Sequence, residues 1–153
     1  MVVENQAGEA VAGGREAGGD AALRVLREVF GHQEFKGHQA EAIGQVVGGG
    51  DAIVLMPTGG GKSLCYQIPA LLRAGAGVIV SPLIALMEDQ VAAVRELGIK
   101  AEYLNSSLTA GEQREVERRY LDGGLDLLYV APERLLNPET LALVGRGRVA
   151  LFA

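Results

Sequence analysis

The chain of 153 residues has only one cysteine, Cys65, and acidic residues outnumber basic ones. A single cysteine excludes an intramolecular disulfide and a cysteine-based zinc site within this stretch, and it is typical of a reducing, cytoplasmic location. No run approaches the ~18 apolar residues of a membrane span, and the first residues lack the pattern of a signal peptide. The net charge of −5 argues against a free-standing nucleic-acid binder. It leaves open one lobe of a larger nucleic-acid enzyme.

The length allows one domain with a full core, and the hydrophobic content of 48% fits an α/β interior. Residues 1–19 are rich in Gly, Ala and Glu and have few large apolar side chains. Such a segment cannot bury enough surface to offset its ordering entropy. We therefore expect a disordered tail over residues 1–19 and one domain over residues 20–153.

Helical and strand-like patterns alternate along the rest of the chain. We expect a helix from Asp20 to near Gly31 and a second over residues 37–47, ended by three glycines. Short apolar runs typical of buried strands recur at residues 51–56, 77–81, 100–104, 125–130 and 148–153. Helical patterns cover residues 62–73, 83–97, 109–121 and 138–144. This alternation predicts an α/β fold in which helices cover both faces of a parallel sheet.

A glycine-rich loop stands between the first apolar run and the next helix. Its sequence is Met56-Pro57-Thr58-Gly59-Gly60-Gly61-Lys62-Ser63. Glycines let backbone N–H groups turn toward an anion, and a helix N-terminus favours negative charge. We expect residues 58–63 to bind nucleotide phosphates, with Lys62 and Ser63 as candidate catalytic residues and Ser63 as the Mg²⁺ ligand. The alternative is that this segment is a chance turn in a chain with 22 glycines. The segment also departs from the generic phosphate-loop pattern, which has a glycine at the position of Met56.

Four segments, in this order, resemble the RecQ family of DNA helicases in superfamily two. They are residues 26–39, the loop with its continuation to Leu71, residues 80–91 (Val-Ser-Pro-Leu-Ile-Ala-Leu-Met-Glu-Asp-Gln-Val) and residues 128–135 (Leu-Tyr-Val-Ala-Pro-Glu-Arg-Leu). Residues 104–107 also have a counterpart in the family, and the resemblance covers residues 23–153. Helicases of this superfamily use the shorter form of the glycine loop, without the glycine at the position of Met56. The resemblance implies a RecA-like P-loop NTPase lobe that uses ATP and Mg²⁺. The full protein would unwind DNA from 3′ to 5′ in recombination and repair.

The first segment is similar to the family's adenine-reading motif. The amide of Gln39 has a donor and an acceptor that match the N6/N7 edge of adenine, so Gln39 can select ATP over GTP. In the family a ring and an arginine sandwich the adenine, and these positions fall on His32 and Lys36. An ammonium does not stack as a guanidinium does, so the base contact should be weaker here. Phe30 and Phe35 fit the core better than the base.

The third and fourth segments follow strands that should end at the same sheet edge as the loop. In the family these loops contact the phosphate backbone of single-stranded DNA. The resemblance therefore assigns Ser81, Pro82 and Arg134 to DNA binding. For Arg134, a salt bridge within the lobe is an equal alternative to a phosphate contact.

Residues 148–153 have the pattern of the strand that, in this family, precedes the acidic Mg²⁺ motif Asp-Glu-x-His, also called Walker B. The resemblance thus implies an N-terminal helicase fragment that carries the ATP-binding part only. The second lobe and a zinc region would lie downstream, and a bacterial protein would be associated with the nucleoid. Two other hypotheses stay open: a nucleotide-binding module without catalysis, and an RNA-remodelling ATPase of the same superfamily.

Overall fold

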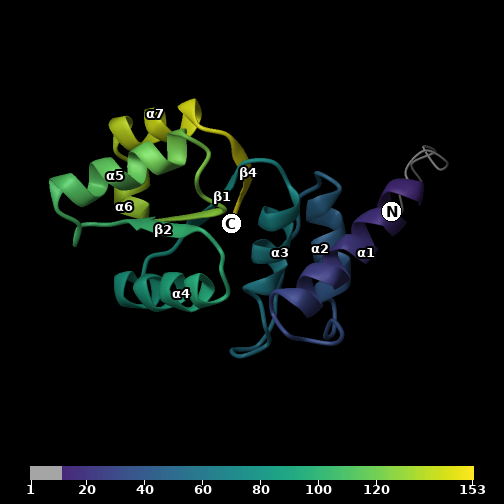
Figure 1. Ribbon diagram of the computed structural model, residues 1–153. Coiled ribbons are helices and arrows are strands. Elements are labelled where there is room, and N and C mark those ends of the chain that lie inside the picture. Colours follow the sequence, from purple (N-terminus) through teal and green to yellow (C-terminus); the bar gives the residue numbers. More distant parts are fainter. Residues whose placement is uncertain (1–11) are drawn as a thin grey trace, which may run out of the picture. The chain divides into compact units, whose positions relative to one another are not determined.

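The computed structural model describes residues 12–153 and divides the chain into two compact units, Met1–Leu72 and Arg73–Ala153 (Figure 1). The described part of the first unit contains the helices α1 (Ala12–Glu28), α2 (Gln39–Val47) and α3 (Leu64–Leu72). Their apolar faces share one core of buried side chains: Ala22, Leu26, Ile43, Leu64 and Ile68. Phe30 and Phe35 pack against this core, as the sequence predicted.

The first helix is longer than its sequence pattern predicted. It begins at Ala12, whereas the expected start was Asp20. Residues 12–19 are therefore helical and do not form part of a disordered tail, and the rest of that predicted tail, residues 1–11, lies outside the described residues. Once Ala22 and Leu26 are anchored in the core, each further helical residue adds a hydrogen bond without a new nucleation step, so the helix extends toward the N-terminus.

The second helix ends at the glycines, as predicted. Gly48 is its C-cap, and Gly49 has a φ of 89°, a conformation that a side chain would strain. The next segment departs from the prediction, because residues 51–56 form no strand. Ile53 and Leu55 are 94% and 93% exposed. A short apolar run becomes a strand only where a neighbouring strand completes its hydrogen bonds, and none of the strand pairs among the described residues includes this segment.

The second unit is built on a four-stranded sheet. Its strands are β1 (Ala76–Val80), β2 (Ala101–Leu104), β3 (Leu127–Val130) and β4 (Val149–Phe152), in the order β2-β3-β1-β4. All three strand pairs are parallel. These strands coincide, within a residue or two at the ends, with the last four predicted apolar runs. The buried strands β1 and β3 read as continuous apolar segments because both of their faces are covered.

Four helices complete this unit: α4 (Ile84–Glu96), α5 (Ala110–Leu121), α6 (Pro132–Leu135) and α7 (Pro138–Arg146). Figure 1 shows α4 on one face of the sheet and α5 and α7 on the other. The predicted parallel sheet with helices on both faces is therefore confirmed. The one-turn helix α6 was not predicted, because four residues are too few for a periodic pattern.

The loops that follow three neighbouring strands meet on the side of the sheet where the carboxyl ends of the strands lie, which we call its carboxyl edge. The N–H of Ser81, after β1, donates to the Val130 carbonyl at 3.1 Å. The N–H of Ala131, after β3, donates to the Leu104 carbonyl at 3.1 Å. The hydrogen bonds between neighbouring strands thus continue one residue beyond the strand ends, and they fix the backbone positions of Ser81 and Ala131. In parallel sheets, this carboxyl edge is where ligands bind.

None of the helices in the described part of the chain combines the length and the apolar character needed to cross a membrane.

Candidate functional site

The glycine loop has a backbone that only glycines can form without strain. Gly59 and Gly61 have φ values of 79° and 77°. At Gly60, a Cβ atom would lie 2.9 Å from the Pro57 carbonyl oxygen. That same oxygen accepts the Gly60 N–H at 3.0 Å and closes a tight turn. The three consecutive glycines are therefore all required by the shape of the loop.

The end of the loop presents backbone N–H groups next to a helix N-terminus. Helix α3 begins at Leu64, directly after Lys62 and Ser63. Among the described residues, the N–H groups of Gly61, Lys62 and Ser63 have no backbone acceptor. Their donors are therefore available for an anion, and the partial positive charge of the helix end adds to the attraction. This arrangement agrees with the phosphate-binding role predicted for the loop.

The side chain of Lys62 is folded back onto its own loop. Its ammonium donates to the carbonyl oxygens of Met56 at 2.8 Å and Pro57 at 3.0 Å. Residue types gave no sign of these acceptors, because every residue carries a carbonyl. The lysine predicted to meet the terminal phosphates therefore already has two partners within the protein.

Gln39 lies at the start of α2 and touches the same loop. Its side chain is only 2% exposed. Its Oε1 accepts the backbone N–H of Lys36 at 2.8 Å. Its Nε2 donates to the carbonyl oxygens of Gly61 at 3.0 Å and Gly60 at 3.4 Å. The structure thus brings the predicted adenine-reading residue and the predicted phosphate loop into direct contact, which the sequence spacing of the two motifs did not reveal.

The other two predicted base-binding residues lie in the connection between α1 and α2. His32 and Lys36 are both exposed. The His32 N–H donates to the Leu26 carbonyl at 3.2 Å, so α1 holds the start of this connection. Arg27 adds a second tie, since its Nε donates to the Gln33 carbonyl at 3.0 Å. The sandwich of a base between these two side chains stays a prediction.

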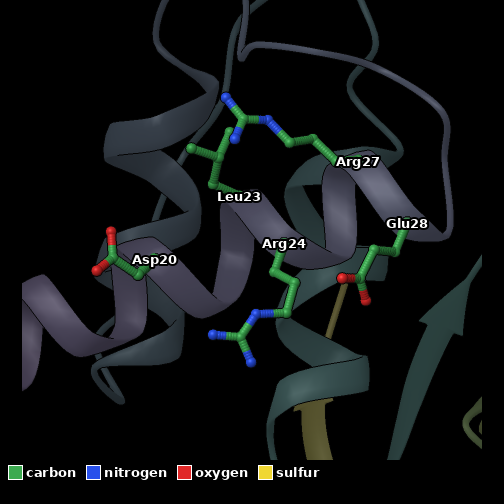
Figure 2. A pocket seen from close by; sticks show the side chains of 5 residues that line it. All are labelled: Asp20, Leu23, Arg24, Arg27 and Glu28. Atoms are coloured by element: carbon green, nitrogen blue, oxygen red, sulfur yellow. The ribbon is translucent and has the colours of Figure 1, made fainter.

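A hollow of about 350 Å³ lies along α1 (Figure 2). It is lined by Asp20, Leu23, Arg24, Arg27 and Glu28. All five side chains come from one helix, and two carboxylates and two guanidinium groups balance in charge. The hollow contains none of the residues predicted to bind a nucleotide. We therefore regard it as part of the solvated face of α1.

Ser63 is the single predicted metal ligand. The described residues contain no group of three or more His, Cys, Asp or Glu side chains that could hold a metal ion. Mg²⁺ next to a nucleotide needs few protein ligands, because phosphates and water supply most of its oxygens. The hydroxyl of Ser63, at the start of α3, fits that limited role.

Cys65 is buried, and desolvation raises the pKa of its thiol, so it acts as a packing residue.

The predicted DNA-binding residues belong to the second unit. Ser81 and Pro82 follow β1, and Arg134 lies in α6 after β3. Arg134 forms no ion pair among the described residues, and its Nε is buried without an acceptor. The salt bridge considered as an alternative for Arg134 is therefore not found in this part of the chain. Arg134 as a whole is half-buried, and its contact with a DNA phosphate stays a prediction.

Asn105 and Ser107 in the loop after β2 form a polar cluster with Glu88 of α4. Asn105 is 3% exposed, and its Oδ1 accepts the Ser107 N–H at 2.9 Å and the Ser107 hydroxyl at 2.6 Å. The same hydroxyl lies 3.0 Å from Oε1 of Glu88 on α4, so its one proton is shared between two acceptors. The Nδ2 of Asn105 is buried without a partner. The cluster ties the residues after β2 to α4.

Comparison with known proteins identifies the family of the chain. Residues 36–146 match the family model described as DEAD/DEAH box helicase. The ATP-dependent DNA helicase RecQ of Haemophilus influenzae is 46% identical over 132 residues, which cover 86% of this chain and 21% of that protein. RecQ of Bacillus subtilis is 43% identical over 133 residues, which cover 86% of this chain and 22% of that protein. The chain thus spans about a fifth of the length of these relatives.

A solved structure shows the same fold. The crystal structure of a hypothetical ATP-dependent RNA helicase from Sulfolobus tokodaii matches with a TM-score of 0.62 at 22% identity. The match covers 81% of this chain and 37% of that one. At this identity the likeness concerns the fold, which is that of a RecA-like helicase lobe. Because the family model covers most of the sequence, the chain belongs to the DEAD/DEAH box helicase family.

Proposed function

We propose that this chain is the ATP-binding part of a RecQ-type DNA helicase, a protein that couples ATP hydrolysis to the unwinding of DNA. The observation that carries the proposal is the glycine loop, with free N–H groups at Gly61, Lys62 and Ser63 next to the start of α3. The identities of 46% and 43% to proteins named ATP-dependent DNA helicase RecQ support the substrate and the reaction.

In this proposal the described residues bind and orient the nucleotide. The N–H groups of the loop hold the phosphates, and the Lys62 ammonium exchanges its two carbonyl partners for phosphate oxygens. Ser63 offers one oxygen to Mg²⁺, which would neutralise phosphate charge during hydrolysis. Gln39, His32 and Lys36 form the base side of the site.

The DNA contact is assigned to the carboxyl edge of the sheet in the second unit. Ser81 and Pro82 lie directly after β1, and Arg134 follows β3, so neighbouring strands supply the three residues. Phosphate oxygens are strong acceptors, and a guanidinium donates to them in a fork. Contacts of this kind position a strand without reading its sequence.

Equilibrium binding to the 153-residue chain tests the proposal. Labelled ATP with Mg²⁺ should bind and be displaced by unlabelled ATP more readily than by GTP. Single-stranded DNA should bind weakly, and more tightly than RNA of the same sequence. The proposal for the nucleotide site would be wrong if the folded chain bound no ATP at millimolar concentration. Tighter binding of RNA than of DNA would instead support the RNA-remodelling alternative.

The chain alone should not turn ATP over. Hydrolysis requires acidic groups that hold Mg²⁺ and orient water, and none of the residues proposed to bind the nucleotide is an Asp or a Glu. Phosphate release by the wild-type chain, with Mg²⁺ and single-stranded DNA, should therefore equal the background rate. DNA-stimulated release would contradict this expectation and would direct attention to Glu88, Asp89 and Glu133 as carboxylates.

A further inference from the structure

We infer that Gln39 is a positioning residue for the phosphates as well as a reader of the base, because its side-chain amide sets the direction of two N–H groups of the glycine loop. The inference rests on the proposed nucleotide site. It starts from the contacts of the Gln39 Nε2 group with the carbonyl oxygens of Gly61 at 3.0 Å and Gly60 at 3.4 Å.

The geometry of the peptide bond converts these contacts into an orientation of the loop. A trans peptide is planar, so its C=O and N–H groups point in opposite directions. The peptide that contains the Gly60 carbonyl also contains the N–H of Gly61. The peptide that contains the Gly61 carbonyl also contains the N–H of Lys62. By holding both carbonyls on its own side, Gln39 turns these two N–H groups to the opposite side of the loop.

These are donors that lack a backbone acceptor among the described residues. They are therefore the groups that an anion would meet. The Gly61 carbonyl has a second donor, the Leu64 N–H at 3.2 Å, so without the amide of Gln39 its peptide would keep one of its two bonds. The peptide of the Gly60 carbonyl has no such backbone donor among the described residues, so it could rotate and present its carbonyl oxygen to the phosphates, which would repel them. Gln39 lowers the cost of binding because it fixes the donors in place before the ligand arrives.

The close approach of the amide depends on Gly61. A Cβ atom at this position would overlap Nε2 of Gln39, and the φ of 77° also favours glycine. Gln39 is itself anchored, since its Oε1 accepts the Lys36 N–H at 2.8 Å and its side chain is 2% exposed. The amide is thus held on both sides, by the connection before α2 and by the loop.

The same contacts restrict how Gln39 reads a base. Its NH₂ group donates to two loop carbonyls, which compete with N7 of adenine for its protons. Its Oε1 keeps one lone pair beside the bond from Lys36. That lone pair can accept the N6 amino group of adenine, and it repels O6 of guanine. Base selection and phosphate binding therefore depend on one amide.

A base-free ligand separates this inference from simple base reading. We would measure the affinities of the 153-residue chain for ATP, GTP and tripolyphosphate by calorimetry, for the wild type and for Gln39→Met, which keeps the side-chain volume. The amide should raise affinity for both ATP and tripolyphosphate, so the variant should lose about tenfold for each, as expected for lost hydrogen bonds to a binding site. Gln67→Met, at a second buried glutamine of the same unit, is the matched control and should change neither affinity.

The outcomes are distinct. Weaker ATP binding with unchanged tripolyphosphate binding would overturn the inference and leave Gln39 as a base reader only. Failure of the wild type to bind either ligand would refute the proposed site itself, and the inference with it.

A measurement on the wild type needs no variant. The side-chain NH₂ protons of Gln39 are bonded and buried, so they should exchange with solvent far more slowly than those of Gln33, which is exposed. Binding of tripolyphosphate should slow the exchange of Gln39 further and shift the N–H resonances of Gly61 and Lys62. Exchange of the Gln39 side-chain protons as fast as those of Gln33 would show that the amide of Gln39 does not hold the loop carbonyls.

Discussion

The ammonium of Lys62 donates to the carbonyl oxygen of Met56 at 2.8 Å, so the charge of the glycine loop is bonded within the loop itself. The Pro57 carbonyl is its second acceptor, at 3.0 Å. Both partners are backbone groups of exposed or half-buried residues, which water can satisfy when the lysine leaves. The lysine is therefore free to exchange its partners without disturbing the core.

Replacing Lys62 by alanine should weaken nucleotide binding by about ten- to a hundredfold and leave the fold intact. A bond from a charged donor to a phosphate contributes about 1.5–3 kcal/mol, and Lys62 is the only lysine of the loop. We would measure ATP affinity together with circular dichroism, and Lys100→Ala, at an exposed lysine of the second unit, serves as the control. Undiminished ATP binding by a folded Lys62→Ala protein would refute the loop assignment.

Arg134 should contribute to DNA binding through charge. Its guanidinium is half-buried and forms no ion pair among the described residues, so its charge is available to a phosphate. Arg134→Ala should weaken single-stranded DNA binding equally for all sequences and should reduce its dependence on salt. Arg146→Ala, at an exposed arginine at the end of α7, is the comparison. Equal affinities of the two variants in fluorescence anisotropy would remove Arg134 from the DNA site.

Replacement by alanine at Gly147 and at Gly145 should have opposite effects on the free energy of unfolding. A Cβ atom at Gly147 would overlap the ring of Tyr120, which is 2% exposed and donates to the Val144 carbonyl at 3.0 Å. Gly147→Ala should therefore lower the free energy of unfolding by about 1–3 kcal/mol, as overpacking does. At Gly145, inside α7, nothing lies within 4 Å of the added atom. Gly145→Ala should stabilise by up to about 1 kcal/mol, and urea unfolding of both proteins tests the contrast.

Thr109 should stabilise α5 in a pH-dependent way. Its side chain accepts the Glu112 N–H, and the Glu112 carboxylate accepts from the hydroxyl and the N–H of Thr109, which forms a capping box. Thr109→Ala should cost about 1 kcal/mol near neutral pH. These hydrogen bonds, first that of the hydroxyl, lower the pKa of Glu112.

The sign of the pH effect follows from that shift. A carboxyl whose pKa is lowered in the folded state stabilises the fold above its ordinary pKa, and the gain is lost as the pH falls through the lowered value. The difference in unfolding free energy between Thr109→Ala and the wild type should therefore shrink in acid. Ser106→Ala, at an exposed serine of the preceding loop, should show no such trend. A difference that is constant between neutral and acid pH would rule out the contribution of Glu112.

Periodicity located most elements of this fold, because the four strands and the longer helices bury whole apolar faces. It failed for residues 51–56, where the apolar pattern fits a strand but none of the strand pairs among the described residues includes the segment. It also failed for the start of α1, where glycines hid the extension of a helix that is anchored further along.

The residues of the nucleotide site were found by type, but their partners were not. Glycines, a lysine and a serine at fixed spacing mark a phosphate loop, and Gln39 marks a base site. The acceptors of Lys62 and of the Gln39 amide are carbonyls of the chain itself, at Met56, Pro57, Gly60 and Gly61. Since every residue has a carbonyl, only the folded backbone shows which ones are used.

The two edges of the sheet in the second unit differ in a way that affects how the protein behaves at high concentration. On β2, Glu102 pairs with Arg95 of α4 and Arg119 of α5, and such a charged group opposes the addition of a strand from another molecule. On the opposite edge, β4 is entirely apolar in sequence, and its Phe152 is 62% exposed. Aggregation by strand addition should therefore proceed through β4, and a charged residue at Phe152 is the substitution that would suppress it.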